Sequence, residues 1–310
     1  MLTDEFHFRT ISLPDDYEGK VTATFIEAKA NHGQRKSVLY IHGWSDYFFH
    51  PHVARQFDVH GYDFYALELR KFGNSLLSHQ HPNYCRSIEE YFEEISRALR
   101  EIRKNSKQPI ILLGHSTGGL ITALYMNSGV ERGLVSALIL NSPFLEMNVS
   151  RFSRVVMPFV AGTIASILPY SKVENTVSPV YNQSLHKDYF GEWDFNKDWK
   201  PINHFPTYFT WLSTVSDAQS KLKNHSAINV PTLILHSAKS INPKTMSEEA
   251  QKSDCVLNVE HIRQIGPKLG KDITMIEIEG AVHDIFLSKE EVRNHTFQEM
   301  FGWIEKRFDE

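Results

Sequence analysis

Residues 110–119 read Ile-Ile-Leu-Leu-Gly-His-Ser-Thr-Gly-Gly and place a Gly-x-Ser-x-Gly motif between an apolar strand and a helical pattern. In this context the chain must reverse from strand to helix within a few residues, which strains the backbone of Ser116 and lifts its Oγ clear of the sheet. Gly114 and Gly118 leave room for neighbouring backbone, and the following helix points its positive end at Ser116. The motif also occurs by chance at the starts of helices, but the strand before it favours a nucleophile.

The sequence on both sides of this motif alternates short apolar runs with longer helical patterns. Strands are predicted at 6–12, 21–28, 37–41, 62–69, 109–113, 137–140, 232–235 and 274–278. Helices are predicted over 87–104, opened by a capping box of Ser87 and Glu90, over 117–128 and over 297–308. Apolar strands separated by helices indicate an α/β fold, with a mostly parallel sheet, an antiparallel start and helices on both faces.

The alternation stops between residues 144 and 229, where aromatic residues, proline and asparagine are frequent. We expect this segment to be an inserted lid (cap) over the sheet, with residues 1–143 and 230–310 forming the core. A separate helical domain is the alternative. The longest apolar stretch, 155–168, contains Pro158 and Gly162 and is too short to span a membrane. For this stretch we favour packing of a lid helix on the core. The alternatives are that it lines an acyl-chain entrance or touches lipid.

The composition is that of a globular protein. The chain has 310 residues, a net charge of −4 and 41% hydrophobic residues, so nucleic acid is not an expected partner. Its two cysteines, Cys85 and Cys255, suit a reducing compartment and are expected to be inert thiols. The amino terminus is acidic and lacks the apolar run of a secretory signal. We expect a soluble, cytoplasmic protein.

Two pairs of alternating histidines, His50-Pro-His52 and His79-Gln-His81, have a spacing that occurs in metal sites. No cysteine or carboxylate cluster accompanies them, so we expect no metal. The turn around Ser116 lacks the Lys-Ser/Thr ending of a phosphate-binding loop. We therefore expect no cofactor.

A serine hydroxyl is a weak nucleophile and needs a general base. Where a strand–turn–helix motif carries the serine, the acid and then the histidine follow it along the chain. Residues 277–284 read Glu-Ile-Glu-Gly-Ala-Val-His-Asp, a strand and a glycine turn followed by His283. We predict His283 as the base. His295 is the competitor, but it lies at the start of the last predicted helix, where a surface position is expected.

The acid must accept the Nδ1–H of the base. Its usual place is the loop just after strand 232–235, but residues 237–243 there contain no Asp, and the first carboxylates to follow are Glu248, Glu249 and Asp254. We choose Asp254, with the preceding residues as an insertion; a surface aspartate is the competing interpretation. Asp284 adjoins the base but, as the next residue, is badly placed to reach its ring.

An oxyanion needs donors that are in place before the reaction. We predict the backbone N–H of Thr117, directly after the nucleophile, and the backbone N–H of Trp44. Trp44 follows His42-Gly43 in the loop after strand 37–41, where the glycine lets the backbone approach.

Four motifs now stand in order: His42-Gly-Trp-Ser-Asp46, Glu68-Leu-Arg-Lys-Phe-Gly-Asn-Ser75, Gly114-His-Ser-Thr-Gly118 and His283. With them the chain resembles, over essentially its whole length, the monoacylglycerol lipase and lysophospholipase branch of the α/β-hydrolases, which includes the serine aminopeptidase group. The resemblance implies an eight-stranded sheet, a helical lid after the sixth strand and no cofactor. It also implies an Asp about thirty residues before the base, the place that Asp254 holds.

The sequence departs from this family at two places. In the usual Asp-x-Arg-Gly-x-Gly-x-Ser, Glu68 stands for Asp, Lys71 for Gly and Phe72 for the usual His. That segment is structural, so the departure bears little on function. The Asp expected soon after strand 232–235 is replaced by Ser240.

Three functions fit these residues. The first is hydrolysis of carboxylic esters with an apolar acyl group (short- or medium-chain esters, monoacylglycerols or lysophospholipid-like molecules) through an acyl-enzyme on Ser116. The second is amide cleavage, as in an aminopeptidase, for which a lid carboxylate must hold the substrate's amine. Candidates for that carboxylate are Glu174, Asp188, Glu192 and Asp194. The third is a ligand-binding protein on a hydrolase scaffold. The exact substrate and the oligomeric state stay open.

Overall fold

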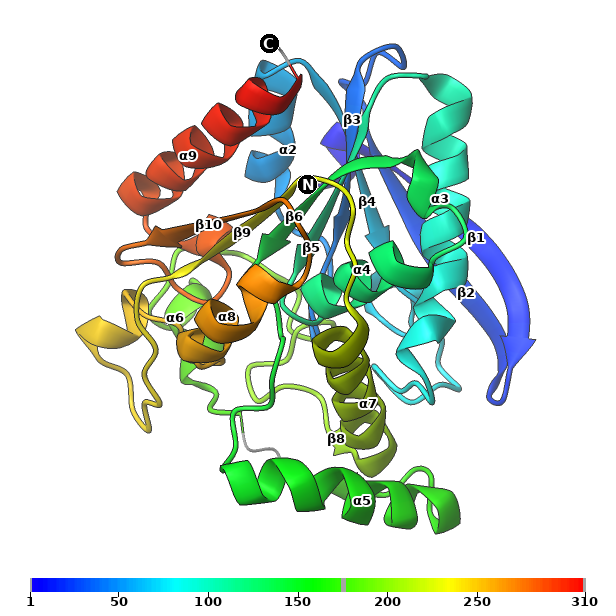
Figure 1. Cartoon of the computed structure of the whole chain (residues 1–310), viewed down its shortest axis with the longest axis vertical. Helices are drawn as coiled ribbons and strands as arrows, with labels where there is room; N and C mark the ends of the chain where they lie inside the picture. The colour runs from blue at the N-terminus through cyan, green and yellow to red at the C-terminus, as the bar shows by residue number, and fades with distance from the viewer. Residues whose placement is uncertain (1, 174–176, 309–310) are drawn as a thin grey trace.

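An eight-stranded sheet forms the centre of the computed structural model, which describes residues 2–173 and 177–308 (Figure 1). Its strands are β1 (Phe6–Asp16), β2 (Gly19–Ala28), β3 (Lys36–Ile41), β4 (Tyr62–Glu68), β5 (Ile110–His115), β6 (Val135–Asn141), β9 (Thr232–Ser237) and β10 (Ile273–Ile278). A second sheet pairs β7 (Lys172–Val173) with β8 (Thr207–Tyr208).

The α-helices of the described residues are α1 (Leu2–Glu5), α2 (Pro51–Val59), α3 (Phe92–Asn105), α4 (Thr117–Ser128), α5 (Arg151–Ile167), α6 (Val180–Leu185), α7 (Phe209–His225), α8 (Val259–Ile265) and α9 (Glu290–Phe308). The short 3₁₀ turns are η1 (Gly73–Ser75), η2 (Ile88–Tyr91), η3 (Arg132–Leu134), η4 (Glu248–Gln251), η5 (Gly266–Lys268) and η6 (Ile285–Leu287).

The strand order of the large sheet is β1-β2-β4-β3-β5-β6-β9-β10. β1 pairs with β2 and β2 with β4 in antiparallel fashion, whereas the pairs from β4 to β10 are parallel. The carboxyl ends of six strands therefore meet at one edge of the sheet. The predicted α/β class, eight strands and antiparallel start are confirmed.

Both faces of the sheet are buried, which explains why the central strands have no polar alternation. In β4 and β5 every residue is buried. One apolar cluster packs α3, α4, α7 and α8 on one face, and a second packs α2 and α9 on the other (Figure 1). This arrangement brings the loops after β3, β5, β6, β9 and β10 together at one edge of the sheet.

One helix prediction is confirmed by the structure, and another places the start of its helix too late. The predicted helix 87–104 is present as η2 and α3, and both hydrogen bonds of the Ser87–Glu90 capping box are formed. The last helix, α9, begins at Glu290, seven residues before the predicted start at 297. Residues 290–295 are polar or only partly buried, so apolar spacing did not mark this first part of the helix.

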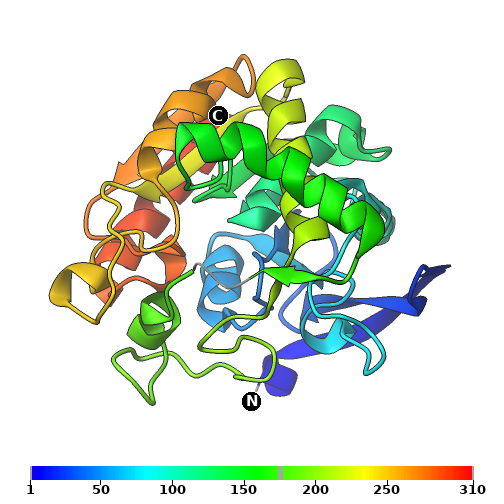
Figure 2. The same cartoon turned by 90° about the horizontal axis from the view of Figure 1, so that it is seen from below.

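The segment between β6 and β9 carries α5, β7, α6, β8 and α7, and α5 packs on α7. Seen from below, α5 crosses in front of the rest of the molecule (Figure 2). The apolar run 155–168 lies mostly on this helix, with Ala161 fully buried while Phe159 and Ile167 are 78% and 73% exposed. Packing on the core thus accounts for one face of α5 only. Within the described ranges, no helix has the length and apolar character needed to cross a bilayer.

Lys71, which stands where the resembled family usually has Gly, belongs to a buried cluster of ion pairs. Its φ of +67° lies in the left-handed region, which a glycine adopts without strain. The Lys71 Nζ lies 2.7 Å from Asp16 Oδ2 and 2.6 Å from Glu18 Oε2, and its side chain is fully buried. Two ion pairs therefore accompany the strained backbone and tie the β1–β2 hairpin to the segment after β4.

Replacing Lys71 by methionine leaves two buried carboxylates without their cation. We expect Lys71→Met to lower the free energy of unfolding by about 3–5 kcal/mol, measured by urea denaturation. Lys20→Met, at an exposed position of the same hairpin, is the control and is expected to change it by less than about 0.5 kcal/mol. Equal effects of the two substitutions would contradict a stabilising role for the cluster.

Candidate active site

The turn between β5 and α4 holds Ser116 in a strained backbone conformation, with φ +53° and ψ −116°. The Ser116 N–H donates to Asn141 O at 2.9 Å, which anchors the turn to β6. A Cβ on Gly118 would meet His42 O at 2.3 Å, and a Cβ on Gly114 would meet Gly118 O at 2.6 Å. Both glycines of the motif are therefore needed for the turn to pack on β3 and on its own helix.

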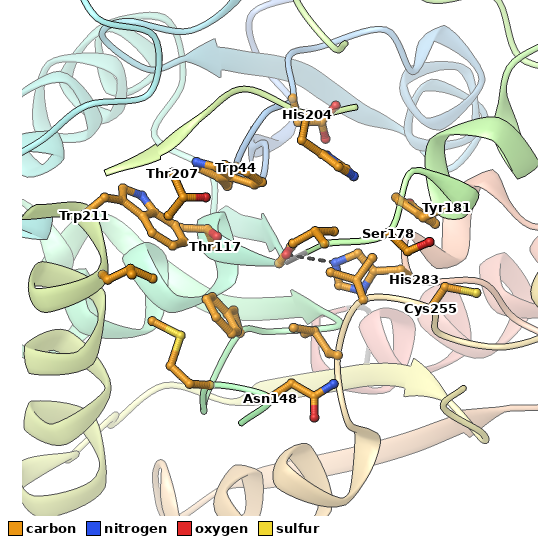
Figure 3. A pocket seen from close by; sticks show the side chains of 18 of the residues that line it. Trp44, Thr117, Asn148, Ser178, Tyr181, His204, Thr207, Trp211, Cys255 and His283 are labelled. Atoms are coloured by element: carbon orange, nitrogen blue, oxygen red, sulfur yellow. Dashed lines mark hydrogen bonds between the residues drawn. The ribbon is translucent and has the colours of Figure 1, made fainter. Parts of the chain in front are cut away.

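Three side chains from distant parts of the chain form one hydrogen-bonded line. Ser116 Oγ lies 2.9 Å from His283 Nε2, the hydrogen bond that the dashed line marks in Figure 3. On the other side of the ring, His283 Nδ1 lies 2.8 Å from Asp254 Oδ2. All three are buried, and Asp254 has no exposed surface. This geometry lets the imidazole accept a proton from the hydroxyl while the carboxylate stabilises the resulting charge.

Asp254 reaches His283 because a long excursion follows β9. The chain leaves at Ser240 and returns at Asp254, and the two residues form a parallel bridge. Asp254 N–H donates to Lys239 O at 2.8 Å and Ile241 N–H donates to Asp254 O at 2.9 Å. The bridge brings Asp254 beside the position that Ser240 occupies at the end of the strand. The structure therefore has an excursion between Ser240 and Asp254, and the prediction that these residues are an insertion stays a prediction.

Asp254 is also fixed by its own backbone surroundings. Its Oδ1 accepts hydrogen bonds from the N–H groups of Val256 and Leu257, both at 2.8 Å. Its second oxygen is left for His283. The competing carboxylates Glu248 and Glu249 have largely exposed side chains, which pair with Lys252 and Lys239.

The remaining candidates for the acid and the base, Asp284 and His295, contact different groups. Asp284 turns away from the neighbouring imidazole and accepts hydrogen bonds from His50 at 3.0 Å and Asn141 at 2.7 Å. His295 is an exposed residue within α9. Among the described residues, His283 is therefore the imidazole that contacts Ser116 Oγ, and Asp254 is the carboxylate that contacts His283.

The two predicted oxyanion donors belong to segments that meet at Ser116. Thr117 opens α4, so its N–H has no partner within the helix. Trp44 follows Gly43, where an added Cβ would lie 3.1 Å from Ser116 Cβ. Both residues line the same cavity as Ser116. The role of the two N–H groups stays a prediction.

His42 fixes the loop that carries Trp44. Its Nε2 accepts a hydrogen bond from Leu69 N–H at 3.1 Å, so its Nδ1 carries the proton and donates to Gly43 O at 2.8 Å. Burial lowers the pKa of His42 to about 4. The loop therefore requires a neutral imidazole.

Ser116 and His283 open into a cavity of about 380 Å³ beneath the segment between β6 and β9 (Figure 3). Much of its wall is apolar, and it includes Phe144, Met147, Met157, Val173, Trp211, Leu212 and Leu257. Cys255 also lines it, and burial raises the pKa of this thiol to about 12. Burial likewise raises the pKa of Cys85 to about 12, so both thiols stay protonated at neutral pH.

Sequence reasoning missed the charged part of this cavity. Asp46 and Lys200 both line it, with Lys200 Nζ 3.0 Å from Asp46 Oδ1. Asp46 stands in a motif recognised from the sequence, but Lys200 lies in the segment 144–229, where no motif marks any position. Only the folded structure brings the two together.

One group of described residues has the composition of a metal site. The ligand atoms of Asp46, His115 and Asp284 lie within 4.8 Å of one another. However, Asp46 binds Lys200, and Asp284 accepts from His50. These partners suit a hydrogen-bonded network beside the base.

The alternating histidines are likewise occupied by protein groups. His50 contacts Asp284, His52 contacts Phe286 O, His79 contacts Lys20 O and His81 contacts Glu18. None of the four lies with two other candidate ligands in a described cluster.

The neutral state of His42 predicts a pH-dependent stability. A folded-state pKa below the unfolded value means that stability is complete above about pH 6.5 and is lost as the pH falls toward 4. We expect the titration of His42 to lower the free energy of unfolding by about 2 kcal/mol as the pH falls from 7 to 5, measured by urea denaturation. His42→Gln should reduce this pH dependence, whereas His7→Gln, at an exposed position, should not. An identical pH dependence in wild type and His42→Gln would refute the prediction.

Comparison with known proteins shows which solved structures share the fold of this chain. Three similar solved structures are a soluble variant of monoglyceride lipase from Saccharomyces cerevisiae in complex with a substrate analogue, monoacylglycerol lipase from Paleococcus ferrophilus, and a thermostable carboxyl esterase from Bacillus coagulans. Their identities to the chain are 17%, 19% and 13%, with TM-scores of 0.69, 0.63 and 0.70. Each alignment covers 97% of this chain and 95%, 99% and 99% of the other, so the fold is shared over its whole length.

A search of curated protein sequences finds no match. The family model for serine aminopeptidase, S33, matches residues 32–290, which include Ser116, Asp254 and His283. The chain therefore belongs to the serine aminopeptidase S33 family of α/β-hydrolases.

Proposed function

We propose that the protein is a serine esterase that hydrolyses carboxylic esters with an apolar acyl group through an acyl-enzyme on Ser116. The observation that carries this proposal is the 2.9 Å contact between Ser116 Oγ and His283 Nε2. Ester hydrolysis is also what the names of the monoglyceride lipase and carboxyl esterase among the similar structures state for those proteins.

In the first half-reaction, Ser116 Oγ attacks the ester carbonyl carbon while His283 Nε2 takes the hydroxyl proton. The carbonyl oxygen becomes an oxyanion, which the N–H groups of Trp44 and Thr117 stabilise. His283 then protonates the departing alcohol, and the acyl group stays on Ser116. Asp254 holds the Nδ1–H of the imidazole throughout and offsets its positive charge.

In the second half-reaction, His283 removes a proton from a water molecule, which attacks the acyl carbon. Collapse of the second tetrahedral intermediate releases the carboxylic acid and returns the proton to Ser116. The apolar cavity wall favours a hydrocarbon acyl group, and a volume of about 380 Å³ suits a small ligand. We also propose that residues 144–229 act as the lid that closes this cavity.

The amide-cleaving alternative has less support. A lid carboxylate for a substrate amine should line the cavity, but Asp188 and Asp194 pair with Lys197 and Lys187 outside it. Glu192 pairs with Arg293, also outside the cavity. Glu174 lies outside the described residues. A purely ligand-binding protein has no need for the complete Ser116–His283–Asp254 line.

The nucleophile is tested by Ser116→Ala. We expect this variant to lose p-nitrophenyl butyrate turnover by at least about 10³-fold and to lose labelling by a fluorophosphonate probe, because no oxygen remains to attack. Unchanged circular dichroism controls for folding. Full turnover by the purified variant would overturn the assignment.

The acid is tested by Asp254→Asn, since an amide cannot stabilise the imidazolium and favours the wrong tautomer. We expect kcat to fall by about 10³- to 10⁴-fold with a smaller change in KM, measured on the same ester. Glu249→Gln, an exposed carboxylate of the same excursion, is the matched control and should retain its rate. If both variants kept wild-type activity, Asp254 would not be the acid.

A further inference from the structure

Asp284 directly follows the base in the chain, yet its carboxylate makes a separate set of contacts. It is buried, with an exposed fraction of 1%, and it does not line the cavity of the active site. Its Oδ1 accepts hydrogen bonds from Asn141 Nδ2 at 2.7 Å and from Phe286 N–H at 3.1 Å, and its Oδ2 accepts one from His50 Nε2 at 3.0 Å. Three donors therefore converge on one buried carboxylate that lies outside the cavity.

Asn141 connects this carboxylate to the nucleophile. It is the last residue of β6, and its backbone oxygen accepts hydrogen bonds from Ser116 N–H at 2.9 Å and from His115 Nδ1 at 3.3 Å. A carbonyl oxygen can only accept, so this contact assigns the proton of His115 to Nδ1. The backbone of Asn141 thus holds the turn of the nucleophile, while its side chain binds the residue after the base.

His50 belongs to the loop that also carries Trp44. This histidine directly precedes α2, at the end of the loop that follows β3. Its Nδ1 accepts a hydrogen bond from Phe49 N–H at 3.3 Å, so its proton is on Nε2, which donates to Asp284. A neutral imidazole is therefore enough to make this bond. The contact links the loop of a predicted oxyanion donor to the loop of the base.

Asp284 is ionised although no lysine or arginine faces it. Burial alone raises the pKa of its carboxyl, but His115, His50 and Asn141 outweigh burial and hold this pKa well below its usual range. Among the residues that the structure describes, these two histidines are the only basic side chains within 4 Å of its oxygens. Burying a charge costs free energy, whereas hydrogen bonds to an ionised acceptor are stronger than those to a neutral one. The charge therefore strengthens the three contacts that converge here.

The three segments that meet at this carboxylate hold the nucleophile, the base and one predicted oxyanion donor. We propose that Asp284 is a positioning residue, whose carboxylate fixes these three groups relative to one another through Asn141 and His50. This inference rests on the proposed ester hydrolysis. Small displacements of reacting groups slow the chemical steps. Because Asp284 lies outside the cavity, its loss is expected to lower kcat and to leave KM nearly unchanged.

Asp284→Asn keeps the size of the side chain but removes its charge and one acceptor oxygen. We expect its kcat on p-nitrophenyl butyrate, counted per site labelled by a fluorophosphonate, to fall by at least about tenfold, with KM within about twofold of wild type. Counting labelled sites separates this effect from a loss of folded protein, which lowers the number of sites but not the rate of each. Asp272→Asn, at an exposed aspartate just before β10, is the matched control and should keep the wild-type kcat.

Two substitutions of His50 test the same link from its other end. His50→Leu removes the donor and should lower kcat per labelled site about as much as Asp284→Asn does. His50→Gln, whose side-chain N–H can still donate to Asp284, should recover most of that loss. Because the two residues act through one contact, the double variant Asp284→Asn/His50→Leu should be little slower than either single variant.

A kcat per labelled site in Asp284→Asn equal to that of wild type would overturn the inference. If this variant yields no labelled site, the His50 variants decide, and equal kcat values in His50→Leu and wild type would overturn it. Absence of any ester turnover and labelling in wild type would instead refute the proposed function, and the inference would fall with it.

Discussion

The hydrogen bond from Ser116 Oγ to His283 Nε2 joins two residues that are 167 positions apart in the chain. It forms only because β5 and β10 end at the same edge of one parallel sheet. The strained turn at Ser116 and the glycine turn before His283 then direct the two side chains toward each other. Asp254 completes the line through an excursion that closes on itself at Ser240. Most of the remaining structure serves to keep these three groups in place and away from bulk water.

The fold could be predicted because its signals are local. The central strands are continuous apolar runs since both faces are covered, and the Ser87–Glu90 capping box marks its helix through contacts within four residues. The start of α9 at Glu290 was not predicted, because the first turns of this helix have few buried residues and therefore show no apolar periodicity. Lys71 is a further case: a positive φ is compensated by Asp16 and Glu18, which lie more than fifty residues earlier.

The residues of the candidate site also fall into two groups, those that local sequence could predict and those that it could not. Ser116 and His283 could be proposed because each stands at the end of a recognisable strand beside a glycine. Asp254 needed the family spacing as well, since the loop after β9 lacks its Asp. The Lys200–Asp46 pair could not be foreseen. Its lysine lies in a segment where helical spacing appears only in pieces and no strand is clear, and 154 positions separate it from Asp46. Polar groups that meet through tertiary packing leave no spacing in the sequence.

The pairing of Ser116 with His283, and the roles derived from it, can be examined in a single crystal structure of the protein after reaction with an octyl fluorophosphonate. We expect a covalent bond from Ser116 Oγ to phosphorus, with the phosphoryl oxygen about 2.7–3.1 Å from the N–H groups of both Trp44 and Thr117. His283 Nε2 should lie within hydrogen-bond distance of Oγ. An adduct on another residue, or a phosphoryl oxygen turned away from both N–H groups, would contradict the mechanism.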